Sequence, residues 1–143
     1  MPMEVVVFAC QQAVPDPEAL KSLWGLADVR FRVLPEPCSS KVEAFQLLRT
    51  LATPVDLVWV IGCEESLCRL AEGSQRAGGR MAYTKKYLEE IGLEPARVGR
   101  TVVTPGDQAA LRAAVAEIQD RLKSLGASPL RQAPQSAARR AAP

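Results

Sequence analysis

The sequence predicts a doubly wound α/β fold built on a parallel β-sheet of about four strands. Short β-branched runs alternate along the chain with stretches in which apolar residues recur at helical spacing. This alternation is typical of parallel sheets whose strands are joined by helices. The runs Val5–Phe8 and Val58–Ile61 are continuously apolar, as in strands that are buried on both faces. We therefore expect helices on both faces of the sheet.

The expected strands cover residues 4–9, 29–34, 56–61 and 100–104. In the second of them, Arg30 and Arg32 alternate with apolar residues, which indicates a half-exposed strand at the edge of the sheet. Pro35 and Pro37 follow directly and are expected to end this strand.

The expected helices lie between and after these strands. Asp16 is a suitable N-cap for the first helix, which stops at Gly25. Ser39 or Ser40 is suited to cap the second, which closes at Thr53–Pro54. Residues 73–79 are expected to be flexible, a third helix is expected to end at Gly92, and a fourth runs from Asp107 to Gly126.

The length and composition indicate one globular domain and a tail. A chain of 143 residues with 48% hydrophobic and 24% charged residues is ordinary for a single domain. From residue 127 to 143 almost nothing large and apolar remains, so we expect a folded domain over 1–126 and a disordered basic tail over 127–143. The arginines of the tail, Arg131, Arg139 and Arg140, would suit contact with nucleic acid or an acidic partner, although a solvated terminal tail is the favoured interpretation.

No apolar run approaches the roughly 20 residues that a membrane span requires. The N-terminus lacks the basic and small-residue pattern of a signal peptide. We therefore expect a cytoplasmic protein without a membrane span. In that compartment, four cysteines indicate metal binding or redox chemistry more than structural disulfides.

The cysteines follow the predicted strands. Cys10, Cys38 and Cys63 each come after a different strand, and Cys68 lies close behind Cys63. Because the carboxyl ends of parallel strands share one edge, where ligands bind in doubly wound folds, the four thiols are placed to meet there. Helix N-termini that follow these loops also favour the thiolate form.

The chemistry of such a site is restricted because the chain has no histidine. This excludes Ser/His and Cys/His catalysis, mixed Cys/His zinc sites and Rieske centres. The spacing alone is as compatible with cysteines that only pack in the core as with a shared site. Within a shared site, zinc and an iron-sulfur cluster both suit four thiolates.

Several charged residues flank the cysteines. Glu64 and Glu65 would make the surroundings of a cluster more negative, although solvated first-turn helix residues are the favoured interpretation. Lys41, Arg69 and Arg80 would offset an anionic cluster or serve only as surface charges.

Two motifs in the sequence are especially specific. They are the Gly-Cys-x4-Cys loop at residues 62–68 and the Gly-Leu-Glu-Pro-x-Arg-Val run at 92–98, which stand beside Cys10 and Pro37-Cys38-Ser39. With these motifs, residues 4–125 resemble the delta subunit family of methyl-viologen-reducing hydrogenase, a small iron-sulfur protein. The resemblance implies a flavodoxin-like domain with one [2Fe-2S] cluster and no catalysis of its own. It also implies electron transfer between a flavin-containing heterodisulfide-reductase A-like protein and a hydrogenase, formate dehydrogenase or other oxidoreductase subunit.

One departure from the family concerns the first strand end, where members usually carry Cys-x-x-Cys and this chain has Ala13 as the last residue. Since four thiolates suffice for a [2Fe-2S] cluster, we expect Cys10, Cys38, Cys63 and Cys68 to be the ligands. The alternatives are an altered or absent cluster, a structural zinc site in an interaction module, and a flavodoxin-like domain that binds flavin or another ligand while its cysteines only pack.

Overall fold

The computed structural model describes residues 2–53, 55–64 and 73–132. Its centre is a four-stranded parallel sheet with the strand order β2-β1-β3-β4. The strands are β1 (Met3–Cys10), β2 (Val29–Glu36), β3 (Leu57–Cys63) and β4 (Val98–Val103). The predicted α/β class is confirmed, and the strand order is that of the first four strands of a flavodoxin-like sheet.

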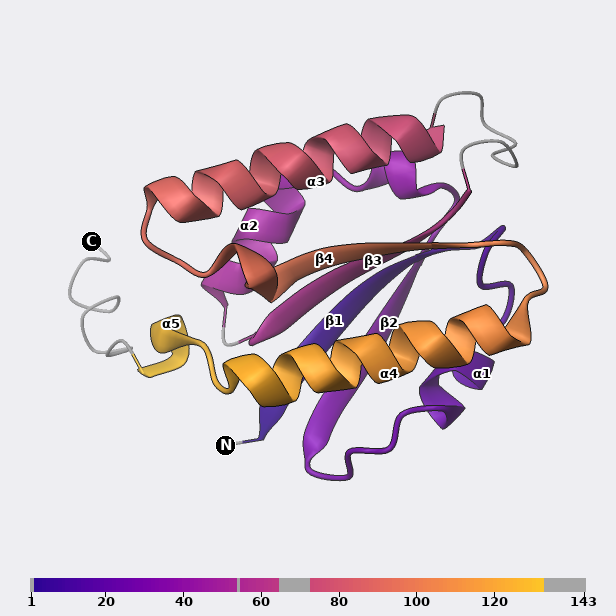
Figure 1. The fold of residues 1–143 in the computed structure, drawn as a ribbon, viewed down its shortest axis with the longest axis horizontal. Coiled ribbons are helices and arrows are strands. Elements are labelled where there is room, and N and C mark those ends of the chain that lie inside the picture. The colour runs from indigo at the N-terminus through magenta and orange to yellow at the C-terminus, as the bar shows by residue number, and fades with distance from the viewer. Residues whose placement is uncertain (1, 54, 65–72, 133–143) are drawn as a thin grey trace.

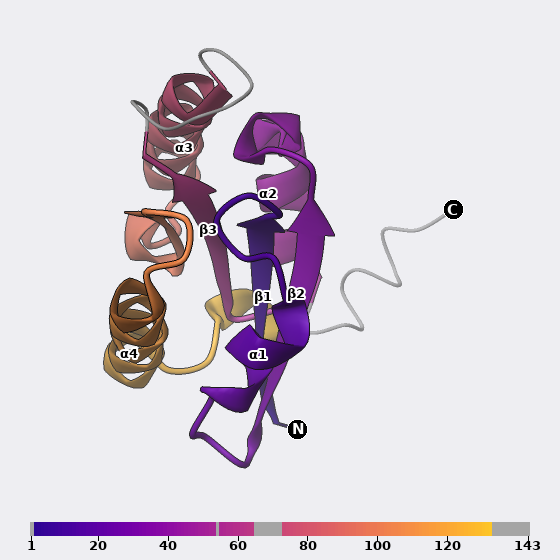
Figure 2. The same cartoon turned by 90° about the vertical axis from the view of Figure 1, so that its right-hand side faces the viewer.

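Helices cover both faces of the sheet, as the two views in Figures 1 and 2 show. On one face lie α1 (Pro17–Ser22) and α4 (Gln108–Leu125), and on the other lie α2 (Ala44–Ala52) and α3 (Gly73–Glu90). The short helices are η1 (Ser39–Lys41), η3 (Pro95–Arg97) and α5 (Pro129–Gln132). Within the described residues, no helix is both long and apolar enough to cross a membrane.

The central strands β1 and β3 are buried on both sides, which explains their continuous apolar pattern. Val7 packs in the cluster under α1 and α4, together with Ile118. Its neighbour Val6 packs in the cluster under α2 and α3, together with Leu47 and Leu88. Side chains that alternate along a strand therefore supply two separate cores.

The ends of the helices confirm most of the predicted caps. Asp16 accepts a hydrogen bond from the backbone N–H of Glu18 at 3.1 Å, and Asp107 accepts one from Ala110 at 3.0 Å. Gly92 and Gly126 have φ angles of 83° and 68°, in the left-handed region that glycine occupies without a steric penalty.

Two helix predictions are wrong. Ser39 lies in the separate turn η1, and α2 begins after Glu43, whose backbone N–H donates to Gln46 Oε1 at 2.7 Å. Residues 73–79 form the first part of α3, although they include Gly78 and Gly79. Tertiary packing outweighs their low helix propensity, because Met81 and Ala77 on the same helix are buried.

The strands also extend further than predicted. β2 continues through Pro35 to Glu36, which is possible because β2 is an edge strand and Pro35 need not donate to a second neighbour. Arg30 and Arg32 are exposed on this strand, as the alternation predicted. β1 includes Cys10, so this cysteine belongs to the sheet itself.

The folded part of the chain continues past Gly126, where the sequence predicted the tail to begin. The backbone N–H of Ser128 donates to Asp56 Oδ1 at 2.7 Å, and the carbonyl of Ala127 accepts from Arg97 Nη2 at 3.1 Å. These contacts hold the segment against the start of β3, and α5 follows. Residues 133–143 of the predicted tail lie outside the described residues.

Candidate functional site

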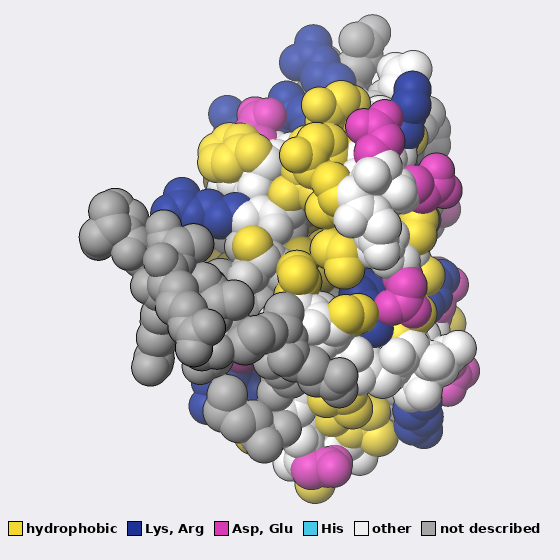
Figure 3. All heavy atoms as spheres, turned by 90° about the vertical axis from the view of Figure 1, so that its left-hand side faces the viewer, with side chains coloured by type: hydrophobic (Ala, Val, Ile, Leu, Met, Phe, Trp, Pro, Cys, Tyr) yellow, Lys and Arg dark blue, Asp and Glu magenta, His cyan; other side chains and the backbone are white. Residues whose placement is uncertain are grey.

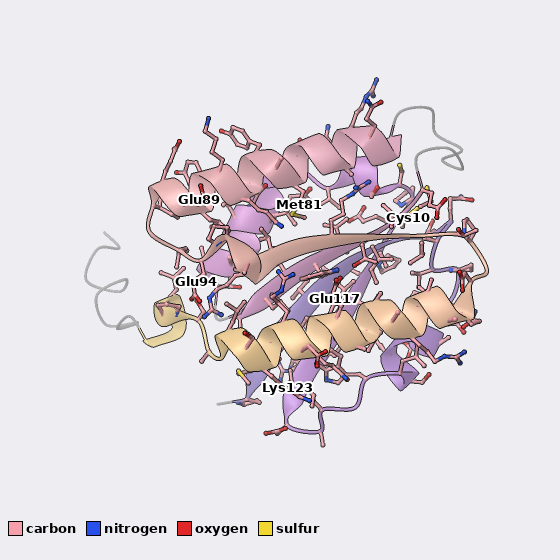
Figure 4. The ribbon with its side chains drawn as sticks, viewed as in Figure 1. Cys10, Met81, Glu89, Glu94, Glu117 and Lys123 are labelled. Carbon is pink, nitrogen blue, oxygen red and sulfur yellow. The ribbon has the colours of Figure 1, made fainter. Side chains whose placement is uncertain are left out.

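The two central strands both end in cysteine. Cys10 is the last residue of β1 and Cys63 is the last residue of β3, and these strands pair up to Ala9 and Ile61. The strand order reverses between β1 and β3, which is the point where doubly wound sheets bind their ligands. Figure 2 looks onto this carboxyl edge of the sheet, and Figure 4 labels Cys10 at the same end.

Cys38 comes to the same edge from the neighbouring strand. It lies between the end of β2 and the turn η1, in which Lys41 N–H donates to the Cys38 carbonyl at 2.9 Å and Val42 N–H donates to the Ser39 carbonyl at 3.1 Å. The turn therefore fixes the backbone at Cys38. Three cysteines that are far apart in sequence thus follow three adjacent strands at one edge.

All three cysteines are buried, with exposed fractions of 1% for Cys10, 2% for Cys38 and 1% for Cys63. No disulfide joins them. Cys10 and Cys63 pack in the apolar cluster under α1 and α4, which also contains Ala13. The fourth predicted ligand, Cys68, lies outside the described residues, as do Glu65 and Arg69.

The described residues of the shared edge do not form an assembled metal centre. In the part of the chain that the structure describes, no group of three or more Cys, Asp or Glu side chains is close enough to hold a metal ion. The three cysteines are therefore brought to one edge without being drawn into a single ligand group.

A serine at this edge was missed as a functional candidate, because its position before a helical pattern suggested a cap. Ser39 is 1% exposed, and its Oγ has no hydrogen-bond partner among the described residues. A Cβ atom placed on Gly62 would lie 2.9 Å from this Oγ. The hydroxyl therefore lies against β3 at Gly62, the residue before Cys63.

The residues at this edge fit a thiolate-bound metal in their chemistry. The donor atoms are sulfurs in a chain without histidine, and they are shielded from water. The buried hydroxyl of Ser39 is a donor without an acceptor in the described polypeptide, as expected where a bound group supplies the acceptor. Gly62 leaves the room for that hydroxyl.

The charged residues near the edge have partners of their own or lie in solvent. Glu64 is exposed, and its Oε1 accepts from Thr104 Oγ1 at 3.1 Å. Arg80 forms an ion pair with Glu43 at 3.5 Å. Lys41 is exposed at the end of η1. These side chains are therefore surface groups around the buried thiols.

The motif at residues 92–98 lies at the opposite, amino edge of the sheet, where the strands begin. Arg97 is 2% exposed and donates to the carbonyls of Asp56 and Gly126, each at 3.0 Å. It also donates to Glu94 Oε1 at 2.8 Å. Figure 4 shows Glu94 at the end of the molecule away from Cys10. This motif therefore joins the start of β3 to the end of α4, at the edge of the sheet away from the cysteines.

The surface at this end mixes side chains of every kind. Acidic and basic side chains are interspersed with apolar ones across the face that Figure 3 shows.

The sheet order is that of a flavodoxin-like domain, and three buried cysteines lie at the carboxyl edge of this sheet. Residues 5–126 match the family model of the methyl-viologen-reducing hydrogenase delta subunit. The chain belongs to this family, as the motifs in its sequence indicated.

Individual relatives agree with this membership. The chain is 33% identical over 95 residues to the vhu iron-sulfur subunit of the F420-non-reducing hydrogenase of Methanopyrus kandleri, a match that covers 66% of this chain and 72% of the relative. It is 28% identical over 130 residues to the protein of the same name from Methanococcus voltae, a match that covers 90% of this chain and 95% of the relative.

A third relative is a much larger protein. The chain is 27% identical over 126 residues to the A-type subunit of the ferredoxin/F(420)H(2)-dependent CoB-CoM heterodisulfide reductase of Methanosarcina acetivorans. The match covers 85% of this chain but only 16% of the relative. A domain similar to this one is thus a segment of that reductase protein.

Proposed function

We propose that this chain is a non-catalytic electron-transfer subunit that holds one [2Fe-2S] cluster at the carboxyl edge of its sheet. The proposed ligands are Cys10, Cys38, Cys63 and Cys68. The observation that carries the proposal is that three of these cysteines follow three adjacent strands at the ligand edge of a domain from this family. Relatives named as iron-sulfur subunits support an iron-sulfur cofactor in general.

When bound, such a cluster supplies a site that accepts and releases one electron at a time. The residues of the chain provide its surroundings. The buried positions of Cys10, Cys38 and Cys63 keep water away from the sulfurs, and solvent access is one of the factors that set a reduction potential. The regular strands β1 and β3 fix the backbone at two of the ligands.

The alanine at position 13, where members of the family usually carry a cysteine, is compatible with this proposal. Ala13 is fully buried, and its backbone N–H donates to the carbonyl of Cys10 at 3.1 Å. A small apolar side chain at this position packs beside Cys10 and Cys63 in the same cluster. Four thiolates are sufficient for a [2Fe-2S] cluster, so the loss at position 13 leaves a complete set.

We propose that the electrons pass between a heterodisulfide-reductase A-like flavoprotein and a hydrogenase, formate dehydrogenase or other oxidoreductase subunit. Support comes from the relatives, which include hydrogenase subunits and a heterodisulfide reductase protein with a similar segment. A domain that is fused to a protein in one organism and separate in another is a reasonable partner of that protein.

The cofactor is tested by purifying the protein without oxygen and measuring iron, zinc, sulfide and visible absorption before and after dithionite. We expect a coloured protein with about two irons and two sulfides per chain, which bleaches on reduction. A colourless protein with about one zinc per chain would favour the structural zinc module. Absence of any metal, together with unchanged folding of Cys38→Ser, would favour cysteines that only pack.

The partner is tested by mixing the reduced, desalted protein with a heterodisulfide-reductase A-like flavoprotein under anaerobic conditions. We expect the flavin absorption to bleach as the cluster reoxidises. A Cys63→Ala variant, carried through the same reduction, is the control and should leave the flavin oxidised. A flavin that stays oxidised with the wild-type protein would contradict the partner while leaving the cofactor proposal in place.

A further inference from the structure

We infer that the hydroxyl of Ser39 donates a hydrogen bond to a sulfur atom of the proposed cluster site. This hydrogen bond would raise the reduction potential of the cluster. The inference rests on the proposed function. Its starting point is the combination of almost complete burial, at 1% exposure, with an Oγ that has no partner in the described part of the chain.

A buried hydroxyl without a partner is unfavourable, because it has lost its hydrogen bonds to water and gained none in the protein. Such groups are rare in native structures and require an explanation. Here a substitution by alanine would remove the cost, and yet serine is present. An acceptor that does not belong to the described polypeptide accounts for this hydroxyl.

The position of Ser39 identifies that acceptor. Ser39 follows Cys38 directly, and η1 holds the backbone of both residues through the bonds from Lys41 and Val42. On the other side, Oγ lies 2.9 Å from the place where a Cβ of residue 62 would be, and residue 63 is the next cysteine. The hydroxyl therefore lies against β3 at Gly62, and each of these two residues is next in the sequence to one of the proposed ligands.

The third cysteine follows the last paired residues of the two central strands. Ala9 pairs with Ile61, and the next residues are Cys10 on β1 and Gly62 on β3. The acceptors that the proposed site would bring here are sulfurs, either cysteine thiolates or sulfide. A serine hydroxyl is a donor that suits them.

The direction of the effect follows from charge. Reduction adds negative charge to the sulfurs, and a hydrogen-bond donor stabilises the more negative state. Ser39 thus favours the reduced form. Gly62 takes part by leaving the space that Oγ occupies.

The test is the midpoint potential of the cluster in Ser39→Ala, followed by electron paramagnetic resonance during a redox titration. We expect the ratio of reduced to oxidised protein at a fixed potential to fall about tenfold, which is about 59 mV for a one-electron couple. The matched control is Ser128→Ala, which removes an equally buried serine hydroxyl at the amino edge. It should leave the potential unchanged.

The stability of the iron-free proteins separates this role from a structural one. Ser128 Oγ accepts from Leu130 N–H at 3.2 Å, so Ser128→Ala should lower the urea midpoint. Ser39→Ala should leave the urea midpoint unchanged or raise it, because its hydroxyl has no partner to lose. A clear drop in the midpoint for Ser39→Ala would show that the hydroxyl serves the fold and would overturn the inference.

The outcomes for the inference and for the proposed function are distinct. If the wild-type protein binds no iron, the proposed function fails and the inference fails with it. If the wild-type protein binds the cluster and Ser39→Ala has the same potential, only the inference fails. If Ser39→Ala does not retain its cluster, the test is made on the wild-type protein, by comparing resonance Raman spectra recorded in H₂O and in D₂O. A hydrogen bond from an exchangeable hydroxyl to a sulfur should shift an Fe–S stretching band. Identical bands in the two solvents would overturn the inference.

Discussion

The two edges of the sheet differ in the hydrogen bonding of their buried polar groups. At the amino edge, the guanidinium of Arg97 donates to the carbonyls of Asp56 and Leu125, and the carboxylate of Asp56 accepts from the backbone N–H groups of Glu4 and Ser128. At the carboxyl edge, the thiols of Cys10 and Cys63 are buried, and the hydroxyl of Ser39 has no partner among the described residues. Figure 4 shows these edges at opposite ends of the molecule, marked by Glu94 and Cys10.

This difference separates the part of the molecule that holds the fold from the part that is prepared for a ligand. The amino edge is complete without any added group, so its residues are expected to determine the stability of the iron-free protein. The carboxyl edge has a buried hydroxyl, that of Ser39, with no hydrogen-bond partner among the described residues, so this edge is expected to determine what the protein binds. Substitutions at the two edges should therefore affect different measurements.

The largest loss of stability is expected for Arg97→Met. The substitution leaves the carbonyls of Asp56, Leu125 and Gly126 without their buried donor. We expect the free energy of unfolding of the iron-free protein to fall by about 3–5 kcal/mol. Urea denaturation measures this change. Arg112→Met, at an exposed position of α4, is the control and should change the stability by less than about 0.5 kcal/mol.

A smaller loss is expected for Asp56→Asn. The two carboxylate oxygens accept from Glu4 N–H at 2.8 Å and Ser128 N–H at 2.7 Å. An amide offers one oxygen and one NH₂ group, so one N–H would face another donor, at a cost of about 1–3 kcal/mol. The control Asp107→Asn replaces an N-cap by one that is equally good and should be neutral in urea denaturation. Equal effects of the two substitutions would contradict the role of the amino edge.

Cys10→Ala, Cys38→Ala and Cys63→Ala are expected to show the reverse pattern. Each removes one sulfur from a small buried side chain, so the iron-free protein should lose no more than about 1 kcal/mol of stability. Iron and sulfide analysis after anaerobic reconstitution should show that each variant has lost most of its cluster. A variant that keeps the iron content and potential of the wild type would remove that cysteine from the ligand set.

The smallest change is expected for Ala13→Cys, which restores the cysteine that members of the family usually carry. Because four thiolates already complete the set, the iron content per chain and the midpoint potential should remain those of the wild type. Iron analysis and a redox titration measure them. A marked gain in iron content would mean that the chain without this cysteine lacks a ligand.

The sequence was sufficient to predict the fold wherever burial determines the pattern. The continuous runs of β1 and β3 and the alternating arginines of β2 correspond to central and edge strands. The helix at residues 73–79 was missed because its stability comes from the burial of Ala77 and Met81, which local propensity does not record. The extension of β2 through Pro35 was missed because it depends on which strand lies at the edge.

The candidate site was predictable in part for the same reason. The cysteines could be placed at one edge because their positions at the strand ends are visible in the chain. The role of Ser39 was not visible, since a serine before a helical pattern looks like a cap. Only the distance to Gly62, which belongs to a strand more than twenty residues away in the sequence, places the hydroxyl against β3 at the carboxyl edge of the sheet.

The central claim is that the carboxyl edge, and no other part of the chain, holds the cluster. A crystal structure of the anaerobically purified protein, with anomalous diffraction recorded at the iron absorption edge, tests it most directly. We predict anomalous difference peaks for iron atoms that are bonded to the sulfurs of Cys10, Cys38, Cys63 and Cys68. We also predict that Ser39 Oγ lies within hydrogen-bonding distance of a sulfur. Iron at another place, or a protein that crystallises with zinc or without metal at this edge, would contradict the account.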